Sequence, residues 1–240
     1  MNETTERVRR RRLTRDERRG RILEAAGRMF AEQGYDHALI EQIAEAAGIT
    51  KPVIYHHFTS KRELYIALLD LYRGELLAFM GRRAVAEASP EMRMHEALDA
   101  FFEFVETHPH AWRILFRDPP PSEAALVEAH RRGQERATAA ILPLLAAGPT
   151  VGHPEDPSGA ELVLEREMAA EVIKSATNGL ARWWYEHRQA PRDHLVYVLM
   201  NVMWVGFDRF VAGERWGLGP ESAGTTKPEP PRPGPTGASP

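Results

Sequence analysis

The stretch that most constrains the fold is residues 37–64, HALIEQIAEAAGITKPVIYHHFTSKREL. Gly48 lies near its middle and can adopt the left-handed backbone that ends a helix. Thr50 is a suitable N-cap for a second helix, and Pro52 suits the first turn of that helix, where no backbone N–H is needed. The first helix is predicted from apolar residues at three- and four-residue spacing, namely Ile40, Ile43, Ala44 and Ala47. The pattern therefore predicts a helix, a tight turn and a second short helix.

The second short helix is expected to have one buried edge and one open edge. Ile54 and Phe58 are four residues apart and so share a face, while Lys51, Val53 and His56 point elsewhere. In a helix-turn-helix of this kind the second helix fits the major groove of DNA. Two amphipathic helices joined through glycine also occur in all-helical proteins that bind no DNA, so the spacing alone leaves both interpretations open.

The run from residue 21 to residue 64 resembles the DNA-binding domain of the tetracycline-repressor (TetR) family of transcriptional regulators. The matching residues are Arg21, Ile22, Leu23, Ala25, Ala26, Phe30, Gly34, Tyr35, Ile43, Ala44, Ala47, Gly48, Ile49, Thr50, Tyr55, His57, Phe58, Lys61 and Leu64. The resemblance implies an all-α homodimer with an N-terminal three-helix helix-turn-helix domain and a C-terminal helical domain for ligand binding and dimerisation. It also implies a ligand-responsive regulator, expected to be a repressor, that binds a palindromic double-stranded DNA operator.

Basic charge is concentrated near the helix-turn-helix. Residues 1–65 contain 13 Lys and Arg against 10 Asp and Glu, whereas the remaining residues contain 18 against 24. We therefore expect the N-terminal end to face DNA. Residues 1–13 are expected to be a flexible basic arm that neutralises phosphates or enters the minor groove, with a solubilising tail as the alternative. The predicted DNA-binding residues are Arg9, Arg10, Arg11, Arg12, Thr50, Lys51, Pro52, Val53, Tyr55, His56 and Lys61.

Two residues of the helix-turn-helix depart from the family pattern, and a third, Glu41, is an unexpected charge for a surface that faces DNA. Ala38 and Leu39 stand where members usually carry Thr or Ser, whose hydroxyl caps the second helix and can reach a phosphate. Asp36 could cap that helix only if the helix began earlier. Glu41 would be repelled by DNA unless it accepts a hydrogen bond from a cytosine amino group, so we expect a solvated carboxylate. A dimeric interaction protein that has lost DNA binding is therefore kept as an alternative.

The remaining sequence predicts further helices. A first helix from Thr14 to near Gly34 completes a helix-turn-helix domain at residues 14–60. A long helix from Lys61 to about Glu87 should connect it to the ligand-binding and dimerisation domain, residues 61–217. Other helices are expected at about 90–108, 122–147, 161–187 and 193–211, with a loop at 148–159. Residues 218–240 are rich in proline and glycine and are expected to be disordered.

The last predicted helix carries the expected dimer interface. Its residues 195–207 are apolar almost all round, yet this stretch is too short to cross a bilayer. It must therefore be covered on two sides, by its own domain and by a partner chain, as in a four-helix bundle. The candidate interface residues are Leu195, Leu199, Val202, Trp204 and Phe210, and their pattern does not tell which of them face the partner.

The C-terminal domain is rich in aromatic residues, most of which are expected in the core. A cavity between its helices should be apolar, with few polar groups to orient a ligand. The candidate ligand-binding residues are Phe101, Phe104, Trp112, Phe116, Asn178, Arg182 and Trp183. The segments LTRDERRG, AFFEFVETH and LARWWYEH are similar to those of family members that sense long-chain fatty acyl thioesters. The inducer is thus expected to be a hydrophobic small molecule, either a fatty acyl thioester or a drug-like compound.

Patterns typical of enzymes are lacking in this sequence. It contains no nucleophile elbow, no phosphate-binding glycine loop and no His-Glu-x-x-His motif, so no cofactor is predicted. His108 and His110 lack a third ligand at matching spacing, so no metal site is predicted. The chain has no cysteine, which fits the cytoplasm, where we expect the protein to act. A helical enzyme on the same scaffold is the second alternative.

Overall fold

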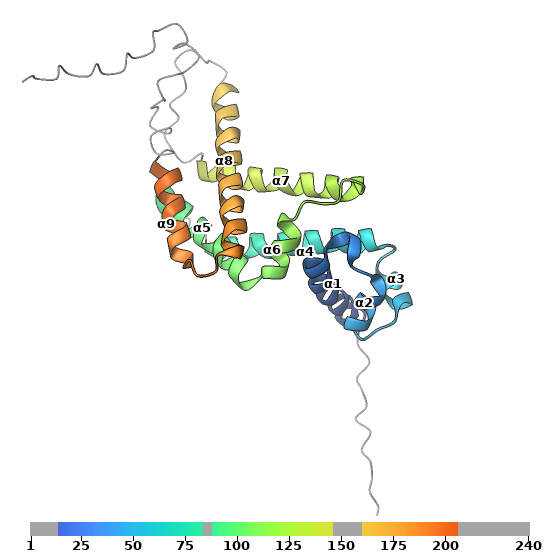
Figure 1. The fold of residues 1–240 in the computed structure, drawn as a ribbon. Coiled ribbons are helices and arrows are strands. Elements are labelled where there is room, and N and C mark those ends of the chain that lie inside the picture. Colours follow the sequence, from blue (N-terminus) through green and yellow to red (C-terminus); the bar gives the residue numbers. More distant parts are fainter. Residues whose placement is uncertain (1–13, 84–87, 146–159, 206–240) are drawn as a thin grey trace, which may run out of the picture.

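The computed structural model describes residues 14–83, 88–145 and 160–205, and within these ranges every regular element is a helix (Figure 1). The prediction of an all-α fold is confirmed. The predicted basic arm, the 148–159 loop, the proline-rich tail, Arg9 to Arg12 and Phe210 lie outside the described residues. The helices are α1 (Arg15–His37), α2 (Ile40–Ala46), α3 (Lys51–His57), α4 (Lys61–Gly81), α5 (Pro90–Thr107), α6 (Pro109–Phe116), α7 (Ala124–Leu145), α8 (Ala160–Glu186) and α9 (Arg192–Leu199), which continues into a π-helical turn, Met200–Trp204.

Capping residues and glycines set the ends of the N-terminal helices. A capping box opens α1, because the Thr14 hydroxyl accepts from the Glu17 N–H and the Glu17 carboxylate accepts from the Thr14 N–H. The regular helix is interrupted at Gly34, near its predicted end, because φ there is +81°, and a further helical segment of α1 then reaches His37. Gly48 (φ +67°) forms the turn between α2 and α3 as predicted. Thr50 is the N-cap residue of α3, although its side chain makes no capping hydrogen bond.

Helix α4 connects the two parts of the chain, but it is shorter than predicted. Figure 1 shows α1–α3 packed around one end of α4 and the later helices around the other. The helix ends at Gly81 instead of near Glu87, and residues 84–87 lie outside the described ranges. Glycine is a poor helix former, and just beyond it Arg83 forms ion pairs with Asp99 and Glu103 of α5. Side-chain pairing to a neighbouring helix thus accompanies the end of α4.

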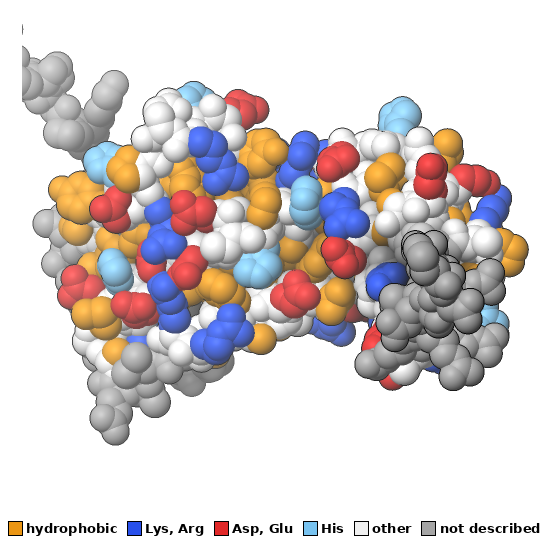
Figure 2. All heavy atoms as spheres, turned by 90° about the horizontal axis from the view of Figure 1, so that it is seen from below, with side chains coloured by type: hydrophobic (Ala, Val, Ile, Leu, Met, Phe, Trp, Pro, Cys, Tyr) orange, Lys and Arg blue, Asp and Glu red, His pale blue; other side chains and the backbone are white. Residues whose placement is uncertain are grey.

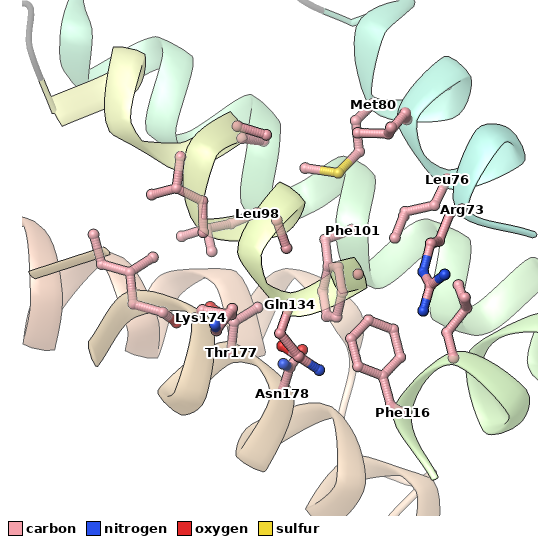
Figure 3. Close-up of a pocket in the computed structure, with 18 of the residues that line it drawn as sticks. Arg73, Leu76, Met80, Leu98, Phe101, Phe116, Gln134, Lys174, Thr177 and Asn178 are labelled. Carbon is pink, nitrogen blue, oxygen red and sulfur yellow. Dashed lines mark hydrogen bonds between the residues drawn. The ribbon is translucent and has the colours of Figure 1, made fainter. Parts of the chain in front are cut away.

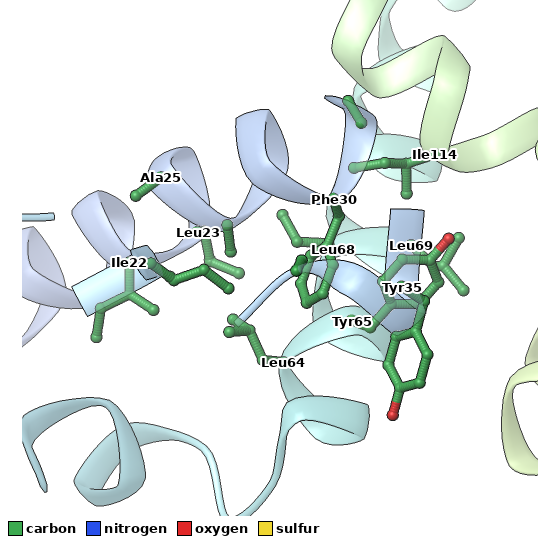
Figure 4. Packing of buried hydrophobic residues seen from close by; sticks show 14 of the residues in the cluster. Ile22, Leu23, Ala25, Phe30, Tyr35, Leu64, Tyr65, Leu68, Leu69 and Ile114 are labelled. Carbon is green, nitrogen blue, oxygen red and sulfur yellow. The ribbon is translucent and has the colours of Figure 1, made fainter. Parts of the chain in front are cut away.

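A continuous hydrophobic cluster joins the helix-turn-helix to the rest of the molecule (Figure 4). Phe30 of α1 lies against Tyr65 of α4, with ring centroids 5.0 Å apart in an edge-to-face arrangement. The cluster extends to Ile114 of α6, which contacts α1 as well as α4. The predicted domain boundary at residue 60 therefore falls between α3 and α4, within a region that shares one core.

A second cluster holds α5, α8 and α9 together. It contains Phe102, Trp184, Leu195 and Leu199, and the Trp184 Nε1–H donates to the Ala190 carbonyl at 2.7 Å. On the face of the molecule that Figure 2 shows, acidic and basic side chains are interspersed, so no charge of one sign dominates the described part of that face. Within the described ranges, no helix combines the length and hydrophobicity needed to cross a membrane.

Candidate DNA-binding surface and ligand pocket

Helix α3 has one buried edge and one open edge. Ile54 and Phe58 are 1 % and 2 % exposed and anchor the helix in the first hydrophobic cluster. The open edge carries most of the predicted DNA-binding residues: Thr50, Lys51, Pro52, Tyr55 and His56 are exposed, and Val53 is half-buried. This arrangement leaves a polar, partly aromatic surface free to enter a groove of DNA.

The carboxylate of Glu41 in α2 contacts the open edge of α3 and is not surrounded by solvent only. Its Oε1 lies 2.5 Å from the Lys51 Nζ, so a salt bridge joins α2 to α3. The hydrogen bond from Lys51 is the main cause that lowers the pKa of Glu41. Both side chains remain exposed, so the pair is open to competition from a phosphate or another anion.

The N-terminus of α2 lacks a side-chain cap. Leu39 is the N-cap residue and makes no capping hydrogen bond, while Ala38 is fully buried. Asp36 lies in the last turn of α1, and its carbonyl accepts a hydrogen bond from the Lys61 Nζ at 3.1 Å. No hydroxyl contact forms at this point: Ala38 packs in the core, and Leu39 is 52 % exposed.

Lys61, the first residue of α4, contacts the C-terminal end of α1. Its Nζ lies 4.7 Å from the centroid of the Tyr35 ring, a cation–π contact, and burial lowers the pKa of the ammonium group. The side chain is half-buried and already holds the Asp36 carbonyl. A phosphate contact by Lys61 would have to add to these bonds or replace them.

Basic groups of α1 lie beside α3. The guanidinium of Arg19 lies 5.1 Å from the Phe58 ring centroid. Burial is the largest cause that lowers the pKa of His57, followed by His56, Arg15 and Arg18. The His57 Nε2 is buried without a hydrogen-bond partner in the described structure. His57 thus belongs to the support of α3, whereas His56 faces outward.

Polar side chains from the α6–α7 connection bind the N-terminal domain. The Arg117 guanidinium donates to the carbonyls of Phe30 and Ala31, both at 3.2 Å, next to the kink of α1. The Tyr35 hydroxyl donates to Glu123 at 3.4 Å, and burial together with Glu123 raises the pKa of Tyr35 to about 12. The domain contact is therefore both apolar and polar.

A cavity of about 180 Å³ lies between α4, α5, α7 and α8 (Figure 3). Its walls are mainly apolar, and the rings of Phe101 and Phe116 meet edge to face, with centroids 5.8 Å apart. A cavity near 150 Å³ can hold a small apolar molecule, whereas sites that enclose a whole drug-sized ligand measure about 300–1,000 Å³. A long chain would therefore have to push the helices apart.

The predicted ligand-binding residues lie in several places. Phe101, Phe116 and Asn178 line the cavity. Phe104 and Trp112 are buried elsewhere, stacked on His108 and Tyr185 respectively. Arg182 is exposed and lines a shallow surface groove between α7 and α8. Trp183 is also exposed and stacks on His187, with ring centroids 4.2 Å apart.

Several cavity residues escaped prediction. They include most of the apolar lining and the polar residues Arg73, His130, Gln134, Lys174 and Thr177. A signal for Arg73 was available, because it shares a helix face with Leu69, Leu76 and Met80 at three- to four-residue spacing. A charged residue on the apolar face of a helix deserves a functional explanation.

The described dimer residues divide between α9 and the π-helical turn that continues it. Leu195 and Leu199 are buried against their own domain. Val202 is 72 % exposed, and Trp204 is half-buried. Helix α8 also exposes apolar residues at four-residue spacing, namely Leu164, Met168 and Val172. The single chain thus leaves apolar stripes on both of its last helices.

A helix-turn-helix with an open recognition helix, joined through one long helix to a domain with an apolar cavity, is the arrangement expected of a DNA-binding regulator. The chain belongs to the TetR family of bacterial transcriptional regulators. Residues 22–68 match the family model "Bacterial regulatory proteins, tetR family", and residues 90–206 match "Tetracyclin repressor-like, C-terminal domain". The resemblance seen in the sequence is confirmed.

Known relatives agree with this assignment. The chain is similar to the HTH-type transcriptional activator FasR of Mycolicibacterium smegmatis, with 30% identity over 81% of this chain and 85% of FasR. Its fold is similar to that of a TetR-like transcriptional regulator from Rhodococcus sp. RHA1 (TM-score 0.67, 24% identity, 85% of this chain and 100% of that one). The fold is also similar to FadR from Bacillus subtilis, solved in complex with stearoyl-CoA (TM-score 0.63, 19% identity, 82% and 99% covered).

Proposed function

We propose that the protein is a dimeric regulator that binds a palindromic operator through α3 and is released by a hydrophobic small molecule. The observation that carries the DNA-binding part is the division of α3 into a buried edge and an exposed polar edge. In a two-fold dimer the two copies of α3 would enter successive major grooves about 34 Å apart. Lys51, Tyr55 and His56 would contact bases or phosphates there.

The dimer would form through α8 and α9. Their exposed apolar stripes, with Val172 and Val202 as members, suit a four-helix bundle made from two chains. Of the residues predicted for this interface, Val202, Trp204 and Phe210 remain in the proposal, because Leu195 and Leu199 already pack inside their own chain. Val202→Glu should place a charge in the bundle, yield monomers in size-exclusion chromatography with light scattering, and abolish tight operator binding.

The DNA contacts can be tested by fluorescence anisotropy with DNA from the region upstream of the protein's own gene. Replacing both Lys51 and His56 by alanine should weaken binding at least tenfold and blur the preference for the specific site. Arg131→Ala is a matched control, because this exposed arginine lies on α7 and pairs with Glu128 and Glu135. Unchanged affinity of the double variant would refute α3 as the recognition helix.

An apolar ligand is supported by the walls of the cavity. A fatty acyl thioester is the first candidate, because FadR, which shares this fold, was solved with stearoyl-CoA. A drug-like hydrophobic compound is the rival. A ligand that separates the helices around the cavity would tilt α4 and change the distance between the two recognition helices of the dimer. DNA is released if the ligand binds more tightly to the conformation in which these helices are further apart. Mass spectrometry of the purified protein after denaturation would identify a ligand carried from the cell.

Repression is the proposed sense of regulation. FasR is an activator by name, so activation is the alternative. In vitro transcription from the upstream promoter decides between them, since a repressor lowers transcript yield and an activator raises it. The uncapped α2 and the Glu41–Lys51 pair favour a second candidate, a dimer without DNA binding, and binding that does not discriminate operator from random DNA would support that candidate.

A further inference from the structure

Arg73 is a cation on the apolar face of α4. Its side chain is 16 % exposed and points toward the cavity beside Leu76 and Phe116 (Figure 3). A guanidinium in such a place is costly unless charged or polar partners compensate for lost water. The hydrogen-bond partners of the Arg73 guanidinium therefore show whether Arg73 has a structural role or can bind a ligand.

The partners of Arg73 leave most of its donor capacity unused. One nitrogen donates to the Ala129 carbonyl of α7 at 2.9 Å, and the other lies 3.5 Å from the carboxylate of Asp70, which is largely exposed. A guanidinium has five N–H donors. Lys174, on the opposite side of the cavity, is the contrast, because its Nζ lies 2.7 Å from Glu171.

Charged groups of both signs act on Arg73. Burial is the main cause that lowers the pKa of Arg73, and Arg136 and Arg132 lower it further, while Asp70 acts in the opposite direction. His130 also lines this side of the cavity, and its pKa is lowered by burial and by Arg73. An anion placed here would meet the guanidinium of Arg73 and the imidazole of His130 at a mainly apolar cavity wall.

Gly133 makes room for the guanidinium. A Cβ atom at this position would lie 2.3 Å from the nearest guanidinium nitrogen of Arg73 and 2.5 Å from its Cζ. Such separations are impossible, so any larger residue would drive the guanidinium away from α7. Arg73 thus occupies a niche between α4 and α7 that depends on a missing side chain.

We propose that Arg73, with His130 beside it, binds the anionic head group of an amphipathic ligand whose apolar chain enters the cavity. The head group would be a carboxylate or the phosphate-bearing end of a thioester. In binding it, the guanidinium stays in its niche beside Gly133 and offers the anion the N–H donors that Ala129 and Asp70 leave unused. This inference rests on the proposed function and assigns the head-group end of the same ligand site.

The test uses isothermal titration of the full-length protein with octanoate, 1-octanol and octanoyl-CoA. Octanoate should bind at least tenfold more tightly than octanol, because a charge-assisted hydrogen bond to a buried guanidinium adds to chain burial. Arg73→Met should reduce this ratio to about one and leave octanol binding within about threefold. If octanoate binding does not depend on Arg73 but octanoyl-CoA binding is weaker in Arg73→Met, the phosphates of the thioester are the group that Arg73 binds.

Gly133→Ala provides an independent variant that keeps every charge. It should also lose the preference for the anion, because the new methyl group displaces the guanidinium. Gly179→Ala is its control, since a Cβ there meets nothing within 4 Å, and Arg131→Met is the charge control. Circular dichroism melts show whether each variant is folded.

Three results would overturn the head-group site. The first is that wild type binds octanoate and octanol equally and that Arg73→Met leaves octanoyl-CoA binding unchanged. The second is a preference for octanoate over octanol that survives in Arg73→Met, and the third is that no probe binds. Operator binding without ligand is measured in parallel by anisotropy. If the wild-type protein does not bind the operator, the proposed function is contradicted. If it binds the operator and one of the three results is found, only the head-group site is contradicted.

Discussion

The two ends of α4 differ in how firmly they are packed. Toward the DNA-binding domain, Leu64, Leu68 and Leu69 are almost completely buried in the first cluster. Toward the cavity, Met80 is half-buried and Leu77 is 55 % exposed. A close-packed end resists deformation and moves as a unit with its neighbours, whereas an end beside a cavity can shift at low cost. The contrast indicates that ligand binding would move α4 at its loose end and carry the recognition helix with it.

The largest expected effect sharpens this contrast in packing. Leu68→Ala removes a fully buried side chain, so the free energy of unfolding should fall by about 2–5 kcal/mol. Leu77→Ala, nine residues further along the same helix, should change it by no more than about 0.5 kcal/mol. Urea denaturation followed by circular dichroism measures both. Equal losses would mean that the two ends of α4 are packed alike.

The polar contact between the regions should contribute less than the core. Arg117→Met removes the donors to the Phe30 and Ala31 carbonyls and leaves those acceptors at the kink of α1 with fewer partners. A loss of about 1–3 kcal/mol is expected in the same urea titration. Arg131→Met, which removes an exposed arginine of α7, is the control and should have little effect. If both variants unfold alike, the Arg117 contact adds nothing to the interface.

Half-buried histidines provide a third comparison between the regions, His57 on the inner side of the recognition helix and His130 beside the cavity. Burial lowers the pKa of each, so the unfolded chain binds protons more readily than the folded protein. Their contribution to stability is therefore present above the unfolded pKa of about 6.5 and is lost as pH falls through the lower folded pKa. Glu63 and Glu171, whose pKa values are lowered from 4.5, affect stability only at more acidic pH.

The corresponding measurement is the melting temperature at pH 7.5 and pH 5.5. Wild type should lose stability between these values, and His57→Gln and His130→Gln should each lose less. A variant with the wild-type decrease would show that its histidine does not titrate differently on folding. His37→Gln is the control, because that side chain is exposed at the end of α1 and is not among the groups that shift the pKa of His57 or His130.

The recognition edge was predictable from sequence, whereas the ligand site was predictable only in part. Ile54 and Phe58 fix the buried side of α3, so the opposite side had to be exposed wherever the helix packed. The aromatic residues of α5 gave no such guide. Phe101, Phe102 and Phe104 are adjacent on one helix, yet the first lines the cavity while the others enter different clusters. Which of them meets a cavity depends on how α4, α7 and α8 are placed, and that is set by long-range packing.

The smallest expected effect concerns the other cation of interest, Lys51, which has a close carboxylate partner where Arg73 has a distant one. Glu41→Gln removes both the repulsion of DNA and the competitor for Lys51. Operator affinity should therefore rise a few-fold at constant salt, and the slope of log K against log salt should steepen by up to about 0.9 if Lys51 gains one phosphate contact. Anisotropy titrations at several salt concentrations measure both quantities.

Glu45→Gln makes the same change of charge on the same helix, away from the Lys51 pair, and should leave the slope unchanged. A fall in affinity in Glu41→Gln would reverse the interpretation, since Glu41 would then be accepting a hydrogen bond from a base such as cytosine. In that case the loss should be confined to operators with a particular base pair at one position. The salt slope and the base dependence together therefore distinguish a carboxylate that restrains Lys51 from one that reads sequence.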